Sequence, residues 1–155
     1  MDFVLWASRL MHVVSVVVWF GGLIFLNVVM LPVSHYEGHS RSKATVATLT
    51  RFNGFVWSSL WTVLITGLLL MLLSPRFLWF DYSTMWQKLL AVKQIAFLLA
   101  GFFSWQTAKV AGRMKEAQNE PDVYESWRLT YVKLLRRTIF VGLLALLGSA
   151  GMAAM

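Results

Sequence analysis

Residues 3–34 read FVLWASRLMHVVSVVVWFGGLIFLNVVMLPVS, and this stretch decides the fold class. Arg9 is its only charged residue, and no Lys, Arg, Asp or Glu occurs between Leu10 and Ser34. At about 1.5 Å per residue, a helix of this length exceeds the roughly 30 Å hydrocarbon core of a bilayer. A signal peptide is disfavoured because the stretch lacks a basic leading segment and a small-x-small cleavage motif. We therefore predict a permanent transmembrane helix.

The composition of the whole chain points the same way. Apolar residues make up 58% of the 155 residues and charged residues 14%, whereas soluble domains carry roughly 25% charged residues. A soluble domain and a disordered chain are both excluded. The absence of cysteine excludes disulfides, thiolate metal sites and a cysteine nucleophile. In an apolar chain, the net charge of +7 indicates membrane topology and anionic lipid, and not nucleic acid.

Three further apolar runs follow the first, and the second of these three contains Lys88 and Lys93. Only helices satisfy all backbone polar groups within one membrane-crossing segment. The predicted fold is all-α, a single transmembrane domain (residues 1–155) that forms an up-down-up-down four-helix bundle. The predicted helices cover residues 3–31, 50–74, 85–111 and 126–153.

The distribution of positive charge predicts the orientation. Ten of the 14 Lys and Arg residues lie in the connections between the first and second and between the third and fourth helices, or at the helix ends beside them. By the positive-inside rule these connections face the cytoplasm. Both termini are therefore expected outside, on the periplasmic face of a cell inner membrane.

Two ionisable residues are expected deep in the bilayer, His12 and Lys93. Counted from the outer ends of their helices, they lie at about 13 Å and about 12 Å, which is the same level. Ionisable groups retained at depth are functional candidates, because each costs several kcal/mol in hydrocarbon. The alternative is structural: His12 hydrogen-bonds to a neighbouring helix, and the Lys93 side chain extends toward the outer headgroups.

The surroundings of these two residues favour a flat, metal-containing cofactor. An imidazole, aromatic walls and glycine clearance suit a b-type haem. His12 would be an axial iron ligand, Lys93 a second ligand or a tuning charge, and Arg9 a propionate partner. Helical spacing and depth add further candidate cofactor-binding residues, namely Trp19, Gly22, Thr66, Gly67 and Trp86.

Other metal chemistry has weaker support. His35 and His39 are spaced i, i+4, but Pro32 precedes them and Gly38 interrupts them, so a solvated turn is expected instead of a metal site. His35 at the inner end of the first helix is a candidate contact for a quinone. The methionines form no close pairs, which disfavours a thioether copper ladder. No Asp or Glu lies within any predicted span, which argues against a proton-coupled transporter.

The first helix also carries a recognisable pattern, W-x-x-x-L-M-H-x-x-x-x-x-x-W-x-G-G-L, which runs from Trp6 to Leu23. Arg51-Phe52, Thr66-Gly67-Leu68 and Lys93 follow it. Over about residues 3–110 this resembles the superfamily that joins bacterial membrane-embedded protoporphyrinogen IX oxidases to the copper-resistance protein D family. The resemblance implies a haem b four-helix bundle in a bacterial inner membrane, with His12 as axial ligand and Lys93 essential beside it. Where the oxidase branch has a Pro-Arg step, this chain has Asn27-Val28. The resemblance therefore supports the same fold and haem binding for this chain more strongly than it supports the same reaction.

We therefore predict a haem b membrane redox protein that transfers electrons in or beside a respiratory chain. An enzymatic version would be an oxidoreductase that oxidises a porphyrinogen. A copper-handling or copper-export protein and a cofactor-free accessory subunit of a larger complex remain as alternatives. Candidate partners are the lipid bilayer, a quinone, a porphyrinogen, a respiratory subunit and a second copy of the chain.

Overall fold

The computed structural model describes residues 2–36, 38, 42–74 and 83–153, and every regular element in these ranges is helical. Within them, four helices are long enough and apolar enough to cross a membrane. The prediction of an all-α chain with four such helices is confirmed, and these are the features of a multi-pass membrane protein. In chain order the elements are α1 (Asp2–Phe25), η1 (Leu26–Met30), α2 (Leu31–Tyr36), α3 (Lys43–Leu72), α4 (Met85–Glu116), η2 (Ala117–Asn119) and α5 (Pro121–Ala153).

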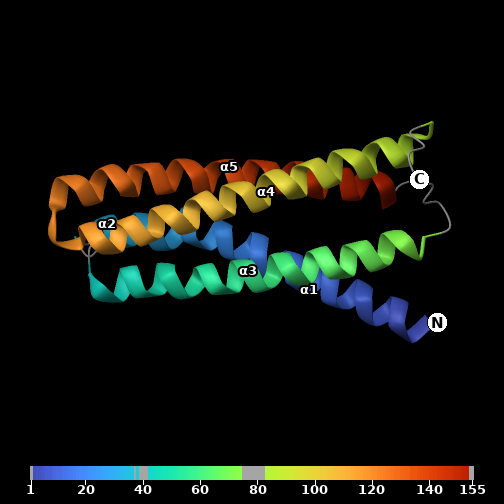
Figure 1. The fold of residues 1–155 in the computed structure, drawn as a ribbon, viewed down its shortest axis with the longest axis horizontal. Helices are drawn as coiled ribbons and strands as arrows, with labels where there is room; N and C mark the ends of the chain where they lie inside the picture. Colours follow the sequence, from blue (N-terminus) through green and yellow to red (C-terminus); the bar gives the residue numbers. More distant parts are fainter. Residues whose placement is uncertain (1, 37, 39–41, 75–82, 154–155) are drawn as a thin grey trace.

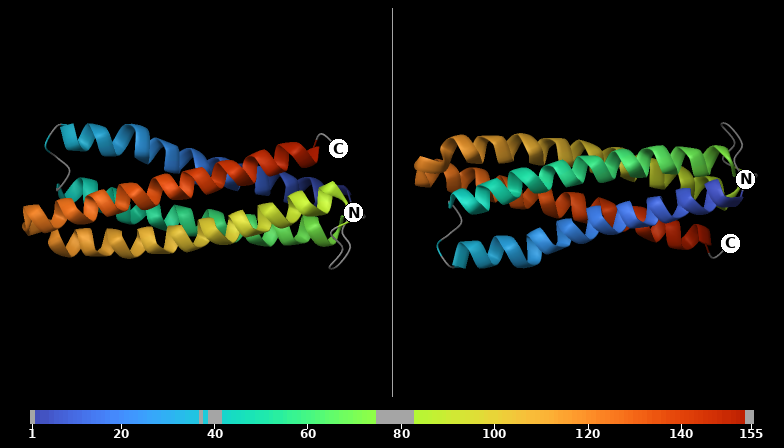
Figure 2. Two further views of the ribbon diagram at one scale, coloured as in Figure 1. Left: turned by 90° about the horizontal axis from the view of Figure 1, so that it is seen from above. Right: turned by 90° about the horizontal axis from the view of Figure 1, so that it is seen from below.

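The helices pack as two pairs. α5 lies along α4, and α1 lies along α3, as Figure 1 shows. Both ends of the chain lie at one end of the bundle in Figures 1 and 2, and α2 lies at the other end with the connection between α4 and α5. The large side chains that are most completely buried belong mainly to the half of the bundle near α2. They are Leu26, Met114, Tyr124, Leu135 and Thr138.

Two helices begin earlier than predicted, and their N-terminal residues explain the difference. α3 begins at Lys43 instead of residue 50, because the Ser42 side chain accepts a hydrogen bond from the Thr45 backbone N–H at 3.1 Å. α5 begins at Pro121 instead of residue 126, and proline suits a first helical position because its missing N–H has no partner there. Both extensions are polar segments, which hydropathy alone does not reveal.

The first span continues past Pro32 to Tyr36, beyond the predicted end at residue 31. A π-helical turn, η1, precedes the proline, and the Leu31 N–H bonds to the Leu26 carbonyl five residues earlier. A proline normally breaks or kinks a helix because it lacks an N–H and its ring clashes with the preceding turn. Here the wider turn changes the hydrogen-bond register just before the proline, and the chain remains helical.

Candidate functional site

The His12 side chain is half-buried on α1 and faces α3. Its Nδ1 atom lies 2.9 Å from Thr66 Oγ1, and that hydroxyl in turn donates to the Thr62 carbonyl at 2.6 Å. Because the Thr66 hydrogen is used in this way, its oxygen accepts from His12 Nδ1–H. The neutral imidazole therefore carries its lone pair on Nε2. No side chain in the described ranges hydrogen-bonds to that nitrogen.

Gly67 allows the imidazole to lie directly against α3. A Cβ atom at this position would stand 3.3 Å from His12 Cε1 and 3.7 Å from Nδ1. The Val63 carbonyl adds a further hydrogen-bond acceptor near the ring. The structure thus brings together three of the predicted site residues, His12, Thr66 and Gly67, in one contact between α1 and α3.

Lys93 is half-buried on α4 and lies close enough to His12 for a charge on one to act on the other. Among the residues that the structure describes, Lys93 forms no ion pair. Trp86 is half-buried two turns nearer the start of α4. His12 from α1 and Lys93 from α4 therefore form a small, purely basic pair within the apolar part of the bundle.

Arg9 lies one helical turn before His12 and is exposed. It has no ion-pair partner in the described part of the chain. Its position toward the end of the bundle that holds the termini leaves its guanidinium accessible to an anionic group. In the described part of the chain, no hydrogen bond or ion pair joins Arg9 to His12 or to Lys93.

Two other predicted site residues, Trp19 and Gly22, serve helix packing. Trp19 is 4% exposed and lies beside Phe20, where a Cβ atom on Gly142 of α5 would meet Phe20 at 2.9 Å and Trp19 at 3.3 Å. A Cβ atom on Gly22 would lie 2.5 Å from Phe52 Cζ on α3. The space at each glycine is therefore filled by an aromatic ring of the protein.

A b-type haem needs a nitrogen donor to iron and room for the macrocycle. His12 fits the first requirement, since its Nδ1–H is held by a neighbouring hydroxyl and its Nε2 is available, which is the usual arrangement of a ligating histidine. Protein rings occupy the clearance expected at Gly22 and Gly67. His12 thus has the donor chemistry that an iron ligand needs, whereas the space at Gly22 and Gly67 is filled by side chains and offers no room for a macrocycle.

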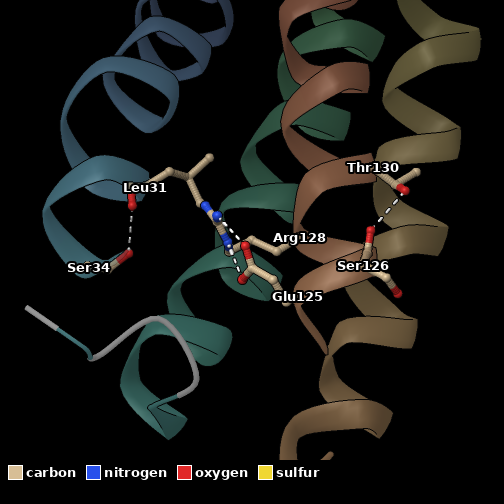
Figure 3. A network of polar contacts seen from close by, with 6 residues as sticks. All are labelled: Leu31, Ser34, Glu125, Ser126, Arg128 and Thr130. Atoms are coloured by element: carbon tan, nitrogen blue, oxygen red, sulfur yellow. Dashed lines mark hydrogen bonds and ion pairs between the residues drawn. The ribbon is translucent and has the colours of Figure 1, made fainter. Parts of the chain in front are cut away.

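The opposite end of the bundle carries a separate polar contact. Arg128 and Glu125 of α5 form a two-point ion pair, with Nε 2.7 Å from Oε2. Figure 3 shows the Arg128 guanidinium reaching from α5 toward Leu31 of α2. His35 of α2 is exposed and acts electrostatically on Glu125, whereas His39 lies outside the described residues. Within the described ranges, no group of three His, Asp or Glu side chains is arranged to hold a metal ion.

Sequence reasoning missed one further polar feature, a small internal pocket between the four long helices. Ser104 and Tyr131 line it, and both are buried. The available signal was spacing, because Ser104 falls on the same face of its helix as Lys93, three turns further along. Tyr131, which lines the same pocket from α5, falls in the sequence among apolar residues, so its spacing did not indicate a polar site.

Comparison with known proteins adds no relative, since the chain matches no protein-family model, no curated protein and no solved structure. The resemblance to the protoporphyrinogen oxidase and copper-resistance protein D superfamily stays a prediction. We therefore base the proposed function on the contacts of His12 and Lys93.

Proposed function

We propose that this protein is a haem b-binding redox protein of a bacterial inner membrane, with His12 Nε2 as an axial iron ligand. The observation that carries the proposal is the His12–Thr66 hydrogen bond, which leaves Nε2 as the free donor nitrogen at depth. Lys93 supports it, since a basic residue kept within a span beside an imidazole has a functional explanation more often than a structural one.

Each residue has a defined task in this proposal. Thr66 holds the imidazole in one tautomer and one orientation, and Gly67 lets the ring approach α3. Lys93 either supplies a second ligand or keeps a positive charge near the iron, which favours the reduced state. Bound haem would supply one-electron redox chemistry. Arg9, one turn toward the outer surface, would pair with a propionate.

The orientation is part of the proposal. α2, the first turns of α3, the last turns of α4 and the first turns of α5 lie at one end of the bundle (Figure 1). A large share of the Lys and Arg residues belongs to this end, among them Lys43, Arg113, Lys115 and Arg128. With this end in the cytoplasm, the chain is an up-down-up-down bundle with both termini in the periplasm. His12 and Lys93 then belong to the outer half of the membrane.

The reaction partners follow from the location of the site. Electrons would pass between a lipid-soluble donor such as a quinone and a respiratory subunit, with oxidation of a porphyrinogen as the enzymatic version. Copper handling has less support, because in the described spans His12 is the histidine far from a helix end, while His35 is exposed at the end of the first span.

A second candidate is a cofactor-free accessory subunit of a larger membrane complex, with a second copy of the chain among its candidate partners. The same hydrogen bond favours this candidate, because the contact between His12 and Thr66 joins α1 to α3 and needs no ligand to do so. In that case Lys93 would serve as a polar contact between helices.

Purification in mild detergent separates the two candidates. The haem protein is expected to show a Soret band, a reduced α-band of b type and iron in proportion to protein. The variant His12→Ala should lose all three, while the matched control His35→Ala, at the exposed end of α2, should retain them. A folded, colourless preparation would support the accessory subunit, and copper in place of iron would support copper handling.

A further inference from the structure

The small pocket found between the helices lies in the half of the bundle near α2, away from His12. All four long helices line it, and its polar lining comes from Asn53 of α3, Ser104 and Thr107 of α4, and Tyr131 and Thr138 of α5. Its interior has room for about one water molecule. A porphyrin, a quinone ring or a lipid headgroup does not fit there.

The hydroxyl groups around this pocket are not equivalent. Thr107 donates to the Phe103 carbonyl at 2.8 Å, and Thr138 donates to the Leu134 carbonyl at 3.0 Å. This bond to the carbonyl four residues earlier is the usual way for a hydroxyl to be satisfied in a membrane helix. Ser104 departs from that pattern, because its Oγ atom is buried and has no hydrogen-bond partner.

The Ser104 hydroxyl therefore faces the pocket without a protein partner. The residue is 3% exposed, so neither bulk water nor lipid headgroups reach it. An unpaired hydroxyl in an apolar environment is unfavourable, because no hydrogen bond compensates for its desolvation. A buried water typically makes about three hydrogen bonds to such groups, and Tyr131 and Asn53 supply further polar atoms on the same pocket.

We propose that Ser104 binds a single buried water molecule, which links α4 to the polar side chains of α3 and α5. The site is independent of the proposed haem ligand. It takes water and no larger ligand, since apolar side chains such as Leu23 and Leu135 close the remaining walls. The water would act as a polar contact that fixes the packing of the four helices in this half of the membrane.

Hydroxyl-radical labelling by X-ray radiolysis tests this proposal, because radicals formed from a bound water modify the side chains beside it. The full-length protein in detergent should show labelling of Tyr131 and Leu135, which line the pocket and are only 3% and 1% exposed. In Ser104→Ala this labelling should fall to the level of the dry core. The matched control Ser149→Ala should keep it, since the Ser149 hydroxyl bonds to the Ala145 carbonyl within its own helix and lies outside the pocket.

Two results would overturn the proposal. One is unlabelled Tyr131 and Leu135 in the wild-type protein, a measurement that does not depend on the variant folding. The other is unchanged labelling in Ser104→Ala, once gel filtration and circular dichroism show that the variant is folded. A high-resolution structure provides a second readout. It should show one water within hydrogen-bond distance of Ser104 Oγ, and an empty pocket or a larger bound molecule would contradict the proposal.

Discussion

The adjacent glycines Gly21 and Gly22 offer a matched test of how α1 packs on α3. A Cβ atom on Gly21 meets nothing within 4 Å, whereas a Cβ atom on Gly22 lies 2.5 Å and 2.6 Å from two atoms of the Phe52 ring. Carbon atoms pack best at about 3.5–4.0 Å, so the ring has to move by about 1 Å in Gly22→Ala. Gly21→Ala requires no such movement.

The expected difference in stability follows from two contributions. Both substitutions gain roughly 0.5–1 kcal/mol from the better helix propensity of alanine, and this gain cancels between the two variants. Overpacking at Phe52 costs about 1–3 kcal/mol. Gly22→Ala should therefore have a free energy of unfolding about 1–3 kcal/mol lower than that of Gly21→Ala.

The assay is titration with SDS in mixed micelles, followed by far-ultraviolet circular dichroism. Adding Phe52→Leu to each variant provides a double-mutant cycle, and it should recover most of the loss at Gly22 while leaving Gly21→Ala unaffected. Equal stability of the two alanine variants would refute the packing argument. Haem content per folded chain is a further readout, since loss of haem without loss of stability would mean that Gly22 provides cofactor clearance after all.

Two further predictions concern the ring of His12 and the charge beside it. Thr66→Val removes the acceptor for His12 Nδ1–H and should weaken haem binding by about 10–100-fold in a haem titration, whereas Thr62→Val, whose carbonyl remains in place, should bind as the wild type does. Lys93→Met removes a positive charge near the iron and should lower the midpoint potential in a redox titration, because the oxidised state is then less disfavoured. Lys88→Met, on the exposed side of the same helix, serves as its control, and equal potentials in the two variants would contradict the tuning role of Lys93.

The long helices were predictable from the sequence, whereas several of their ends were not. Uninterrupted apolar runs define the spans by length, but α3 begins at Lys43 because one serine side chain caps it, and hydropathy is insensitive to a cap. The helical path past Pro32 depends on a π-helical turn at Leu26–Met30, and no residue type in that segment signals such a turn.

The candidate site likewise has a part that the sequence predicts and a part that it does not. Counting residues from the helix ends placed His12, Thr66 and Gly67 at one level, and the structure has them in contact. Depth along a helix follows from the rise per residue, so the sequence contains it. The neighbour that fills the space above Gly22 depends on how α1 rotates and crosses α3, and that is a property of packing between helices.

Haem content of the purified protein tests the central claim most directly. Three samples are needed, wild type, His12→Gly, and His12→Gly supplemented with imidazole, each measured as haem per chain by the pyridine haemochrome method. The proposal predicts haem in the wild type, its loss in His12→Gly, and its recovery when free imidazole replaces the missing ligand. A wild-type protein that folds without haem, or a His12→Gly variant that keeps all of it, would contradict the assignment of His12 as the iron ligand.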